Sequence, residues 1–486
     1  MNKISCFLPY AGKEQVEKTV NSLQATGLIE EIRLITTDAT LESLPDCEIL
    51  FVAMPYSSAT LKAIANAAKG EYTLLYTKET TLEMGMFALE RMIHILEDSS
   101  AGMVYADHYQ IADGKQSNAP VIDYQFGSLR DDFNFGSLLL FNTEKLKEAA
   151  GHMKSDYNFA GLYDLRLKLS QHSNLVHINE YLYSEVENDT RKSGEKIFDY
   201  VDPKNRDRQI EMEQACTEHL KEIGGYLAPE FKKIEFSAGN FEYEASVIIP
   251  VRNRIRTIRD AIKSVLMQKT DFKYNLIIID NHSTDGTTEA IDEFKDDERL
   301  IHIVPERNDL GIGGCWNVGV HHPKCGKFAV QLDSDDVYKD ENTLAIMVRA
   351  FYEQNCAMVV GTYMMTDFNM NMIAPGIIDH KEWTPANGRN NALRINGLGA
   401  PRAFYTPVLR EVKVPNTSYG EDYALGLNFS RQYQIGRVYD VVYLCRRWDD
   451  NSDASLDIVK MNGHNLYKDR IRTWELQARI AMNKNK

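Results

Sequence analysis

The pattern of predicted strands and helices starts again near residue 240, and this restart limits the fold more than any other feature of the chain. Before it, apolar runs typical of strands, at Ile4–Pro9, Ile32–Thr36 and Tyr72–Tyr76, alternate with segments of helical periodicity such as Leu82–Leu96. Strands separated by helices favour a largely parallel sheet covered by helices. We therefore predict an α/β fold for the first half of the chain.

The second half repeats this alternation. Its strand-like runs are Ser246–Pro250, Leu276–Asp280, Leu300–Val304 and Phe328–Leu332, and its helix-like segments include Ile255–Met267 and Thr287–Phe294. Short stretches also match in the same order, because Gly70–Tyr76 resembles Gly326–Leu332 and Tyr163-Asp164 aligns with Glu421-Asp422. This common order favours the duplication of one domain.

The residues between the two halves differ in composition. From Glu187 to Asn240 the charge rises, prolines and paired glycines appear, and Arg206–Ile223 has the pattern of one amphipathic helix. Such a stretch is typical of a connector. We predict a first domain over residues 1–190, a helical connector over 191–240, a second domain over 241–452 and a helical extension over 453–486.

Composition argues against several classes of protein. The formal net charge of −15 is unfavourable for nucleic acid or an anionic membrane surface as the main partner. The seven cysteines form no CxxC pair, which fits reduced thiols better than a disulfide framework or a zinc site. The N-terminal apolar stretch is too short for a signal peptide, and no run approaches the roughly 18 apolar residues of a membrane span. We expect a cytoplasmic protein that reaches any lipid-linked acceptor peripherally, at the inner face of the membrane.

Three carboxylates in four residues, Asp333, Asp335 and Asp336, follow the predicted strand Phe328–Leu332. Acidic side chains this close repel one another, so a hard divalent cation that takes oxygen ligands, Mg²⁺ or Mn²⁺, would explain the arrangement. The alternative is an acidic turn ahead of a solvated helix start. The four residues alone favour the acidic turn, and the rest of the chain has to decide between the two.

Further motifs follow one another in the order of a known family. They are Val247–Arg254, Ile277–Thr287, Asn308-Asp309-Leu310-Gly311, Asn317-Val318-Gly319, Asp333-Ser334-Asp335-Asp336, Glu421-Asp422, and Arg446-Arg447-Trp448 with Asn451-Ser452. Together they resemble the family 2 glycosyltransferases over residues 243–452. The resemblance implies the GT-A fold, which is Rossmann-like with a mostly parallel sheet. With the repeat, we expect two tandem GT-A domains joined by the helical connector.

The resemblance also implies a nucleotide-sugar donor, with UDP as the expected nucleotide. Asp335 and Asp333 would hold the metal, Mn²⁺ or Mg²⁺. The implied donor-binding residues are Pro250, Val251, Arg252, Asn253, Asp280, Asn308, Gly311, Asn317, Asp333 and Ser334. Asp280 would accept the imide N–H of uracil, or else cap the following helix. Arg252 and Arg254 either contact phosphate or are solvated at a helix start.

Glu421-Asp422 resembles the catalytic pair of the family. Asp422 would be the general base that takes the proton of the acceptor hydroxyl, and a single displacement would invert the anomeric centre. Glu421 would position the acceptor or support Asp422. An acidic pair at a helix N-terminus is favourable for the helix dipole alone, which is the structural alternative.

The implied acceptor wall contains Gly399, Arg402 and Trp448. Trp448 is a departure, because many relatives carry a metal-binding histidine there, so the third metal ligand stays open. Trp448 would either stack on an acceptor sugar or pack against the protein. Leu444 stands where the Q-x-x-R-W motif of processive synthases has glutamine.

The first copy lacks these residues, because Thr77-Lys78-Glu79-Thr80 is opposite Asp333–Asp336 and Tyr163 is opposite Glu421, although Asp164 remains. Lys78 could stand in for the charge of a metal, but loss of activity is the simpler interpretation. We predict an inverting, metal-dependent hexosyl- or N-acetylhexosaminyltransferase of glycan or polysaccharide biosynthesis. Its acceptor would be a glycan, lipid-linked or protein-linked. A bifunctional polymerase, a non-catalytic glycan-binding scaffold and a homo-oligomer stay open as alternatives.

Overall fold

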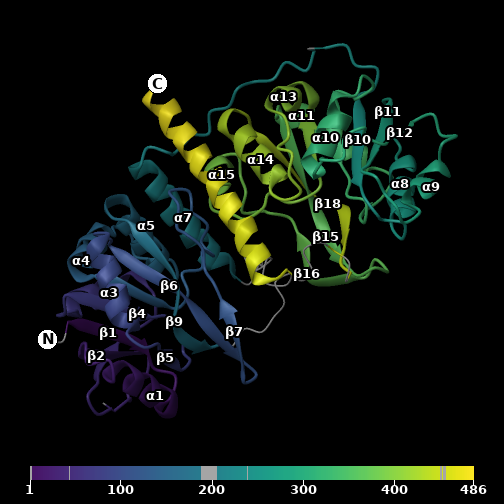
Figure 1. Cartoon of the computed structure of the whole chain (residues 1–486). Coiled ribbons are helices and arrows are strands. Elements are labelled where there is room, and N and C mark those ends of the chain that lie inside the picture. The colour runs from purple at the N-terminus through teal and green to yellow at the C-terminus, as the bar shows by residue number, and fades with distance from the viewer. Residues whose placement is uncertain are drawn as a thin grey trace. The chain divides into compact units, whose positions relative to one another are not determined.

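The computed structural model describes residues 3–42, 44–187, 205–237, 239–448, 451 and 456–485. The chain divides into two compact units (Figure 1). Among the described residues, the first unit holds those up to 187 together with 205–225 and 456–473, and the second holds 226–451 and 474–485. Residues 191–204 of the predicted connector, residues 449, 450 and 452 at the predicted end of the second domain, and residues 453–455 at the start of the predicted extension lie outside the described residues.

The first unit is a mixed α/β sheet with strand order β3-β2-β1-β4-β8-β6-β9-β5, and β7 pairs with β6. Its elements are β1 (Ile4–Pro9), α1 (Lys13–Gln24), β2 (Ile29–Thr36), β3 (Glu48–Phe51), α2 (Ser58–Ala67), β4 (Tyr72–Tyr76), β5 (Leu82–Met84), α3 (Ala88–Asp98), β6 (Met103–Ala112), β7 (Lys115–Ala119), β8 (Leu138–Asn142), α4 (Thr143–His152), α5 (Gly161–His172), β9 (Leu175–Val186) and α7 (Arg206–Glu222). β1 pairs in parallel with β2 and β4, whereas β8 is antiparallel to β4.

Alternating side chains of β1 face two separate parts of the core. Ile4, Cys6 and Leu8 pack with residues of α1 and α3 on one face of the sheet. Phe7 packs on the other face with residues of α2, α4 and α5. Full burial of a side chain such as Phe7 is worth about 2 kcal/mol, so this period-two pattern fixes the register of the central strand.

The second unit has the strand order β12-β11-β10-β13-β17-β15-β18-β14, and β16 pairs with β15. Its elements are β10 (Ala245–Val251), α8 (Ile258–Leu266), β11 (Tyr274–Asp280), α9 (Thr287–Asp292), β12 (Leu300–Ile303), α10 (Ile312–His321), β13 (Phe328–Gln331), β14 (Val337–Tyr338), α11 (Thr343–Gln354), β15 (Met358–Thr366), β16 (Met372–Ile378), α12 (Gly388–Asn391), β17 (Arg402–Tyr405), α13 (Thr406–Val412), α14 (Glu421–Gln432) and β18 (Ile435–Arg446). The predicted α/β fold with two tandem, largely parallel sheets is confirmed.

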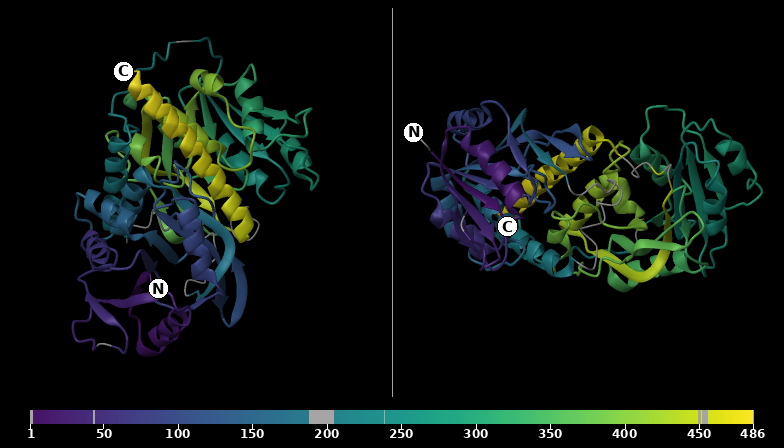
Figure 2. Two further views of the ribbon diagram at one scale, coloured as in Figure 1. Left: turned by 60° about the vertical axis from the view of Figure 1, so that its left-hand side comes forward. Right: turned by 90° about the horizontal axis from the view of Figure 1, so that it is seen from below.

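The C-terminal helix α15 (Ile458–Lys484), yellow in Figures 1 and 2, contributes residues to both units. In the first unit, Asp469 accepts a hydrogen bond from Ser128 Oγ at 3.0 Å and from Arg472 Nη1 at 2.8 Å. In the second unit, Glu475 pairs with Arg431 at 2.6 Å and with Arg479 at 2.7 Å. Buried charges persist when they are paired in this way, so each part of the helix has its own polar anchor.

Equivalent hydrogen bonds show which residues of the first sheet correspond to which residues of the second. Ser5 Oγ accepts a hydrogen bond from Gly70 N–H at 2.8 Å, and Ser246 Oγ accepts one from Gly326 N–H at 2.7 Å. Ile4 is the register partner of Tyr72, as Ala245 is of Phe328. Counting along β4 and β13 from these partners places Thr77 opposite Asp333.

The predicted match of Tyr163-Asp164 with Glu421-Asp422 is wrong by two residues. The helices α5 and α14 both contain twelve residues, and Gly161 and Glu421 are the first residue of each. Tyr163 and Tyr423, the third residue of each, both donate their hydroxyl to a backbone carbonyl. Gly161 and Leu162 therefore occupy the places of Glu421 and Asp422, and the first unit retains neither acidic residue.

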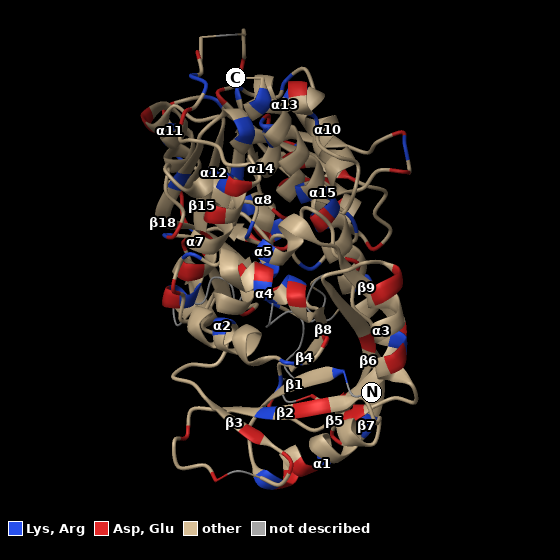
Figure 3. Ribbon diagram, turned by 90° about the vertical axis from the view of Figure 1, so that its left-hand side faces the viewer, with Lys and Arg blue, Asp and Glu red and all other residues tan. Residues whose placement is uncertain are grey.

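The charged residues and the cysteines are dispersed over the structure. On the side drawn in Figure 3, basic and acidic residues are mixed along the elements of both units. All seven cysteines are free thiols, of which only Cys445 is partly exposed. Within the described ranges, no helix is long and apolar enough to cross a membrane.

Candidate active site

A cavity of about 220 Å³ opens where β10 and β13 end, beside the first turn of α14. It is lined by Pro250, Arg254, Ile312, Trp316, Gln331, Asp333, Ser334, Asp335, Arg402, Phe404, Val414, Glu421, Asp422 and Leu425. Ligands of open α/β sheets bind at the carboxyl ends of the strands, which is where this cavity lies. It brings together predicted donor, metal, acceptor and catalytic residues from segments far apart in the sequence.

The loop after β13 carries the acidic motif, and the protein holds it at several points. Asp333 N–H donates a hydrogen bond to Tyr443 Oη at 3.1 Å, and Asp333 Oδ1 accepts one from Gln331 Nε2 at 2.8 Å. Asp335 Oδ2 accepts one from Asn451 Nδ2 at 3.2 Å and lies 3.8 Å from Arg254 Nε. The two carboxylates that line the cavity therefore have defined directions.

Negative charge is in excess at this loop. Burial raises the pKa of the Asp333 carboxyl, and the neighbouring Asp335 raises it further, although Arg402 opposes the shift. Burial also raises the pKa of Asp336 well above its ordinary value. A divalent cation would offset this repulsion, and carboxylate oxygens are its preferred ligands. The residues present thus fit Mg²⁺ or Mn²⁺.

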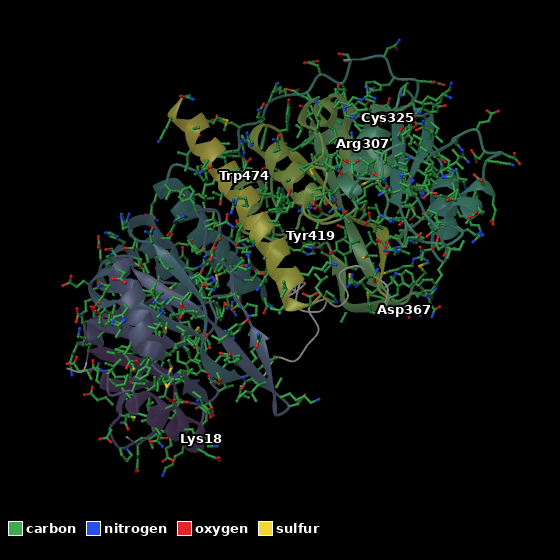
Figure 4. All side chains as sticks on the ribbon, in the orientation of Figure 1. Lys18, Arg307, Cys325, Asp367, Tyr419 and Trp474 are labelled. Carbon is green, nitrogen blue, oxygen red and sulfur yellow. The ribbon has the colours of Figure 1, made fainter. Side chains whose placement is uncertain are left out.

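A third protein ligand for such an ion is not evident. No three His, Cys, Asp or Glu side chains in the described part of the chain are grouped to hold a metal. Trp448 does not line the cavity, and its ring lies 4.7 Å from the guanidinium of Arg256 and 5.5 Å from the ring of Phe368. Phe368 follows Asp367, labelled in Figure 4, in the turn between β15 and β16. These contacts pack Trp448 against the protein.

The acidic pair begins α14 after Gly420, whose φ of 79° is in the left-handed region that favours glycine. Asp422 Oδ2 lies 2.6 Å from Arg402 Nη1, and Asp422 Oδ1 accepts a hydrogen bond from Tyr423 N–H at 2.7 Å. Glu421 Oε2 is buried without a hydrogen-bond partner in the described structure. Burial, and then the charge of Asp422, raise the pKa of Glu421 to about 8.

Gln331 connects the acidic loop after β13 to the strand β17. Its Oε1 accepts a hydrogen bond from the backbone N–H of Arg402 at 3.1 Å, while its Nε2 donates to Asp333. The sequence reading did not single out Gln331, because one polar residue near the end of an apolar strand is a weak signal. Arg402 Nη1 also donates to the carbonyl of Gly399 at 2.8 Å.

The turn after β10 places its predicted donor residues differently. Pro250 and Arg254 line the cavity, whereas Val251 is buried in the strand and Arg252 is exposed. Asn253 has a positive φ of 55°, and its Oδ1 accepts a hydrogen bond from Thr284 N–H at 2.8 Å. Asn253 thus joins two loops next to the cavity.

Asp280, at the end of β11, is fully buried and does not line the cavity. Its Oδ1 accepts a hydrogen bond from Ser283 N–H at 3.0 Å, and its Oδ2 accepts one from Thr288 Oγ1 at 2.5 Å. His302 Nε2 lies 3.5 Å from Oδ2. Despite burial, the nearby His302 ring and the hydrogen bonds from Ser283 and Thr288 hold the pKa of Asp280 well below its usual range.

The helix α10 contributes apolar side chains that the sequence reading missed. Ile312 and Trp316, four residues apart and therefore on one face of the helix, line the cavity. Asn317 does not line it, but hydrogen bonds to the backbone of Val414, which does. Spacing i, i+4 at the start of a helix was the available signal for the apolar pair.

Three other predicted residues lie outside the cavity lining. Asn308 is exposed. Gly311 N–H donates a hydrogen bond to Asn416 Oδ1 at 2.8 Å, and a Cβ at this glycine would lie 2.7 Å from the Thr417 carbonyl carbon. Gly399 has a φ of 97°, which favours glycine, and a Cβ there would lie 2.9 Å from the His380 ring. The two glycines permit close backbone packing next to the cavity.

The equivalent place in the first unit is filled by a buried ionic cluster. Lys78 Nζ lies 2.5 Å from Glu185 Oε1 and 3.3 Å from Glu187 Oε2. Glu185 is also hydrogen-bonded to Ser137, and His108 Nε2 lies 3.3 Å from it. The charge of Lys78 is thus neutralised within the protein.

An acidic loop and a second carboxylate pair line one cavity of an α/β unit, so the site has groups that can hold a divalent cation and accept a proton. The model of the glycosyl transferase family 2 matches residues 246–403. The second unit therefore contains a family 2 glycosyl transferase domain, as the sequence motifs predicted.

Curated relatives carry glycosyltransferase names. An uncharacterized glycosyltransferase of Rickettsia felis is 37% identical over 198 residues, which cover 40% of this chain and 31% of that protein. The putative teichuronic acid biosynthesis glycosyltransferase TuaG of Bacillus subtilis is 29% identical over 126 residues, 26% of this chain and 49% of that one. This chain thus spans less than half the length of either relative.

Solved structures include similar chains as well. Residues 1–349 of S. aureus TarS in complex with UDP-GlcNAc align with a TM-score of 0.38 at 20% identity, covering 49% of this chain and 72% of that chain. A mannosyltransferase from Pyrobaculum calidifontis, in complex with GDP-Man and Mn²⁺, aligns with a TM-score of 0.34 at 15% identity, covering 60% and 86%.

Proposed function

We propose that the second unit is an inverting glycosyltransferase that uses a nucleotide-sugar donor, with UDP as the nucleotide. One observation carries this proposal: Asp333 and Asp335 share a single cavity with Glu421 and Asp422, although about 90 residues separate the two pairs. A sugar nucleotide needs charge stabilisation at its diphosphate and a base at its acceptor, and the cavity offers residues for both.

On the donor side, Asp335 and Asp333 would hold a Mg²⁺ or Mn²⁺ ion, which supplies charge stabilisation for the leaving nucleoside diphosphate when it is bound. Arg254, which lines the same cavity, would contact phosphate. Asp280, held as a carboxylate by its hydrogen bonds, would recognise the base. The remaining donor residues, Pro250, Val251, Arg252, Asn253, Asn308, Gly311, Asn317 and Ser334, would shape this side through backbone and loop contacts.

On the acceptor side, Asp422 takes the proton of the acceptor hydroxyl. The acceptor oxygen forms a bond to the anomeric carbon while the bond from that carbon to the diphosphate oxygen breaks. The electron pair of the broken bond leaves with the nucleoside diphosphate. One bond forms and one breaks, so atoms and electrons balance. A single displacement inverts the configuration, and an α-linked donor gives a β-linked product.

The acceptor is proposed to be a glycan that is lipid-linked or protein-linked. TuaG is named for teichuronic acid biosynthesis, and a Campylobacter jejuni relative, 36% identical over 93 residues, is named as a glucosyltransferase acting on an undecaprenol-linked glycan. These names support polysaccharide or glycan biosynthesis. Gly399, Arg402 and Trp448 are proposed to form the acceptor wall or to support it, Trp448 by packing.

The first unit is proposed not to transfer sugar. Thr77 stands in the place of Asp333, although Glu79 stands in the place of Asp335. Gly161 and Leu162 stand in the places of the acidic pair, so the first unit has one of the two metal-side carboxylates and neither residue of the acidic pair. This argues against a polymerase with two active copies. Retention of both pairs in the second unit argues against a non-catalytic scaffold.

The test is a screen of nucleotide sugars for Mn²⁺-dependent release of nucleoside diphosphate, with the wild-type chain, Asp335→Asn and Asp422→Asn. We expect Asp335→Asn to weaken metal-dependent UDP binding at least about tenfold, because one oxygen ligand loses its charge. Asp422→Asn should bind UDP normally and lose about 10²-fold or more in transfer. Unchanged transfer in both variants, or no turnover of any donor by the wild type, would contradict the proposal.

A further inference from the structure

We propose that Arg402 is a positioning residue that makes Asp422 the ionised member of the acidic pair and leaves Glu421 as a neutral hydrogen-bond donor facing the cavity. This inference rests on the proposed function, since it assigns roles to two carboxyl groups of that site. Two adjacent carboxyl groups in one cavity perform different tasks only if their surroundings differ. Arg402 supplies the difference.

The contacts of the pair are unequal. Arg402 Nη1 lies 2.6 Å from Asp422 Oδ2, and the Arg402 side chain is 15% exposed, so water screens this ion pair weakly. Glu421 Oε2 is buried with no hydrogen-bond partner in the described structure. A buried carboxylate oxygen without a donor is costly, whereas a neutral carboxyl group can turn its O–H toward a sugar hydroxyl.

The charges that face Glu421 come from three places. Asp422 lies next to it on α14, Arg402 faces it from β17, and Asp333 faces it from the loop after β13. Burial and the charge of Asp422 raise the pKa of Glu421 to about 8, while Arg402 opposes this shift. Burial therefore favours the protonated form of Glu421, whereas the Arg402 guanidinium is ion-paired with Asp422.

The position of Arg402 is itself fixed. Its backbone N–H donates to Gln331 Oε1 at 3.1 Å, and its Nη1 donates to Gly399 O at 2.8 Å. Gln331 holds Asp333 with its amide N–H. The direction of Asp422 is thus linked, through Arg402 and Gln331, to the loop that would bind the donor.

The first unit provides an internal comparison. Strand pairing places Leu139 where β17 has Arg402, because Leu74 pairs with Leu140 as Val330 pairs with Ala403. The residues Gln331, Asp333, Arg402, Glu421 and Asp422 correspond to Leu75, Thr77, Leu139, Gly161 and Leu162. The same strand order forms without an arginine at this place, so the fold does not require it. The five polar residues are present together in one unit and absent together in the other.

The kinetic test compares the pH dependence of kcat in the wild type, Arg402→Leu and Arg402→Lys. In Arg402→Leu we expect kcat to fall about 10²-fold with donor KM changed less than about threefold. The acid limb of the profile should move up by about 1–2 pH units, because Asp422 then holds its proton more tightly. Arg402→Lys retains the charge and should recover much of this shift. An unmoved limb in both variants would overturn the proposal.

A second measurement needs neither activity nor a change at Arg402. The infrared C=O stretch of a protonated carboxyl group is recorded at pH 7 for the protein without ligands, for Glu421→Gln and for Asp422→Asn. We expect Glu421→Gln to remove intensity from this band and Asp422→Asn to remove less, because burial still raises the pKa of Glu421 when the charge of Asp422 is gone. The reverse result would overturn the inference. If no donor is turned over by the wild type, the proposed function fails, while the infrared comparison still decides the state of the pair.

Discussion

Asn317 and Val414 are joined by two hydrogen bonds: Asn317 Nδ2 donates to Val414 O at 2.7 Å, and Val414 N–H donates to Asn317 Oδ1 at 3.0 Å. Val414 lines the cavity and Asn317 does not. The amide therefore acts on the site through the backbone that it holds. This relationship gives the motif Asn317-Val318-Gly319 a physical role that does not depend on direct contact with the donor.

Replacing Asn317 with alanine should leave both backbone groups of Val414 without these partners. We expect the free energy of unfolding to fall by about 1–3 kcal/mol and the substrate KM to rise, because one wall of the cavity loosens. Chemical denaturation and steady-state kinetics measure the two effects. Asn21→Ala, at an exposed residue of α1, is the matched control, and equal effects of both variants would contradict this role.

Replacing Gln331 with leucine introduces the side chain found at the equivalent place of the first unit. It removes a hydrogen bond to Asp333 and one to the backbone of Arg402. We expect kcat to fall at least about tenfold while the unfolding temperature changes little, because a misplaced charge in a site is costly for catalysis. Gln116→Leu, on the exposed strand β7, should leave kcat unaltered.

Replacing Lys78 with methionine tests the ionic cluster of the first unit. Glu185 is buried, with 1% of its side chain exposed, and would lose its lysine partner. We expect a loss of about 3 kcal/mol in the stability of the first unit, because a buried charge is left uncompensated. Sugar transfer by the second unit should not change. Lys18→Met, at the residue labelled in Figure 4, removes only the exposed pair with Glu14 and should have no measurable effect. Loss of one of two transfer activities in Lys78→Met would refute an inactive first unit.

Asp164 should make the stability of the first unit depend on pH. It is fully buried, both carboxylate oxygens lack a hydrogen-bond partner in the described structure, and burial raises its pKa to about 6. The folded state then binds the proton more tightly than the unfolded state, whose pKa is about 3.9. The contribution of the protonated Asp164 carboxyl to the stability of the first unit is fully present below about pH 4 and is lost as pH rises to about 6.

The size of this effect is roughly 2–3 kcal/mol. Asp164→Asn should abolish the fall in unfolding free energy between pH 4 and pH 6, measured by denaturation at a series of pH values. The exposed Asp98→Asn should retain it. A fall of the same size in Asp164→Asn would exclude Asp164 as its source.

The sequence predicts the presence of a strand where an apolar run is short and polar or turn-forming residues flank it. Ile4–Pro9 and Tyr72–Tyr76 form strands over the predicted residues. The predicted helix Leu82–Leu96 instead begins with the strand β5, because Leu82–Met84 pairs with β9 at the edge of the sheet. A strand partner about 100 residues away in the sequence can override the helical periodicity of a segment. A local sequence pattern carries no information about such a partner.

The charged residues of the cavity were predictable, whereas Gln331 and the apolar residues of α10 were not. Asp333, Asp335, Glu421 and Asp422 belong to dense acidic motifs that ordinary packing does not explain. In a sequence, Ile312 and Trp316 look like core residues. Only the tertiary structure determines whether an apolar face of a helix packs against protein or lines a cavity. The two-residue misplacement of Tyr163 has a similar origin, because loops of different length separate the matched elements in the two units.

The division of α15 between the units has a consequence for synthesis of the chain. Residues 456–473 complete the first unit, yet they follow almost the whole second unit in the sequence. The ribosome therefore delivers Asp469 and Arg472 only after about 230 residues of the second unit have been made. Until then, Ser128 lacks its helical partner. Synthesis of the first unit begins first, but neither unit is complete until its part of α15 has been made.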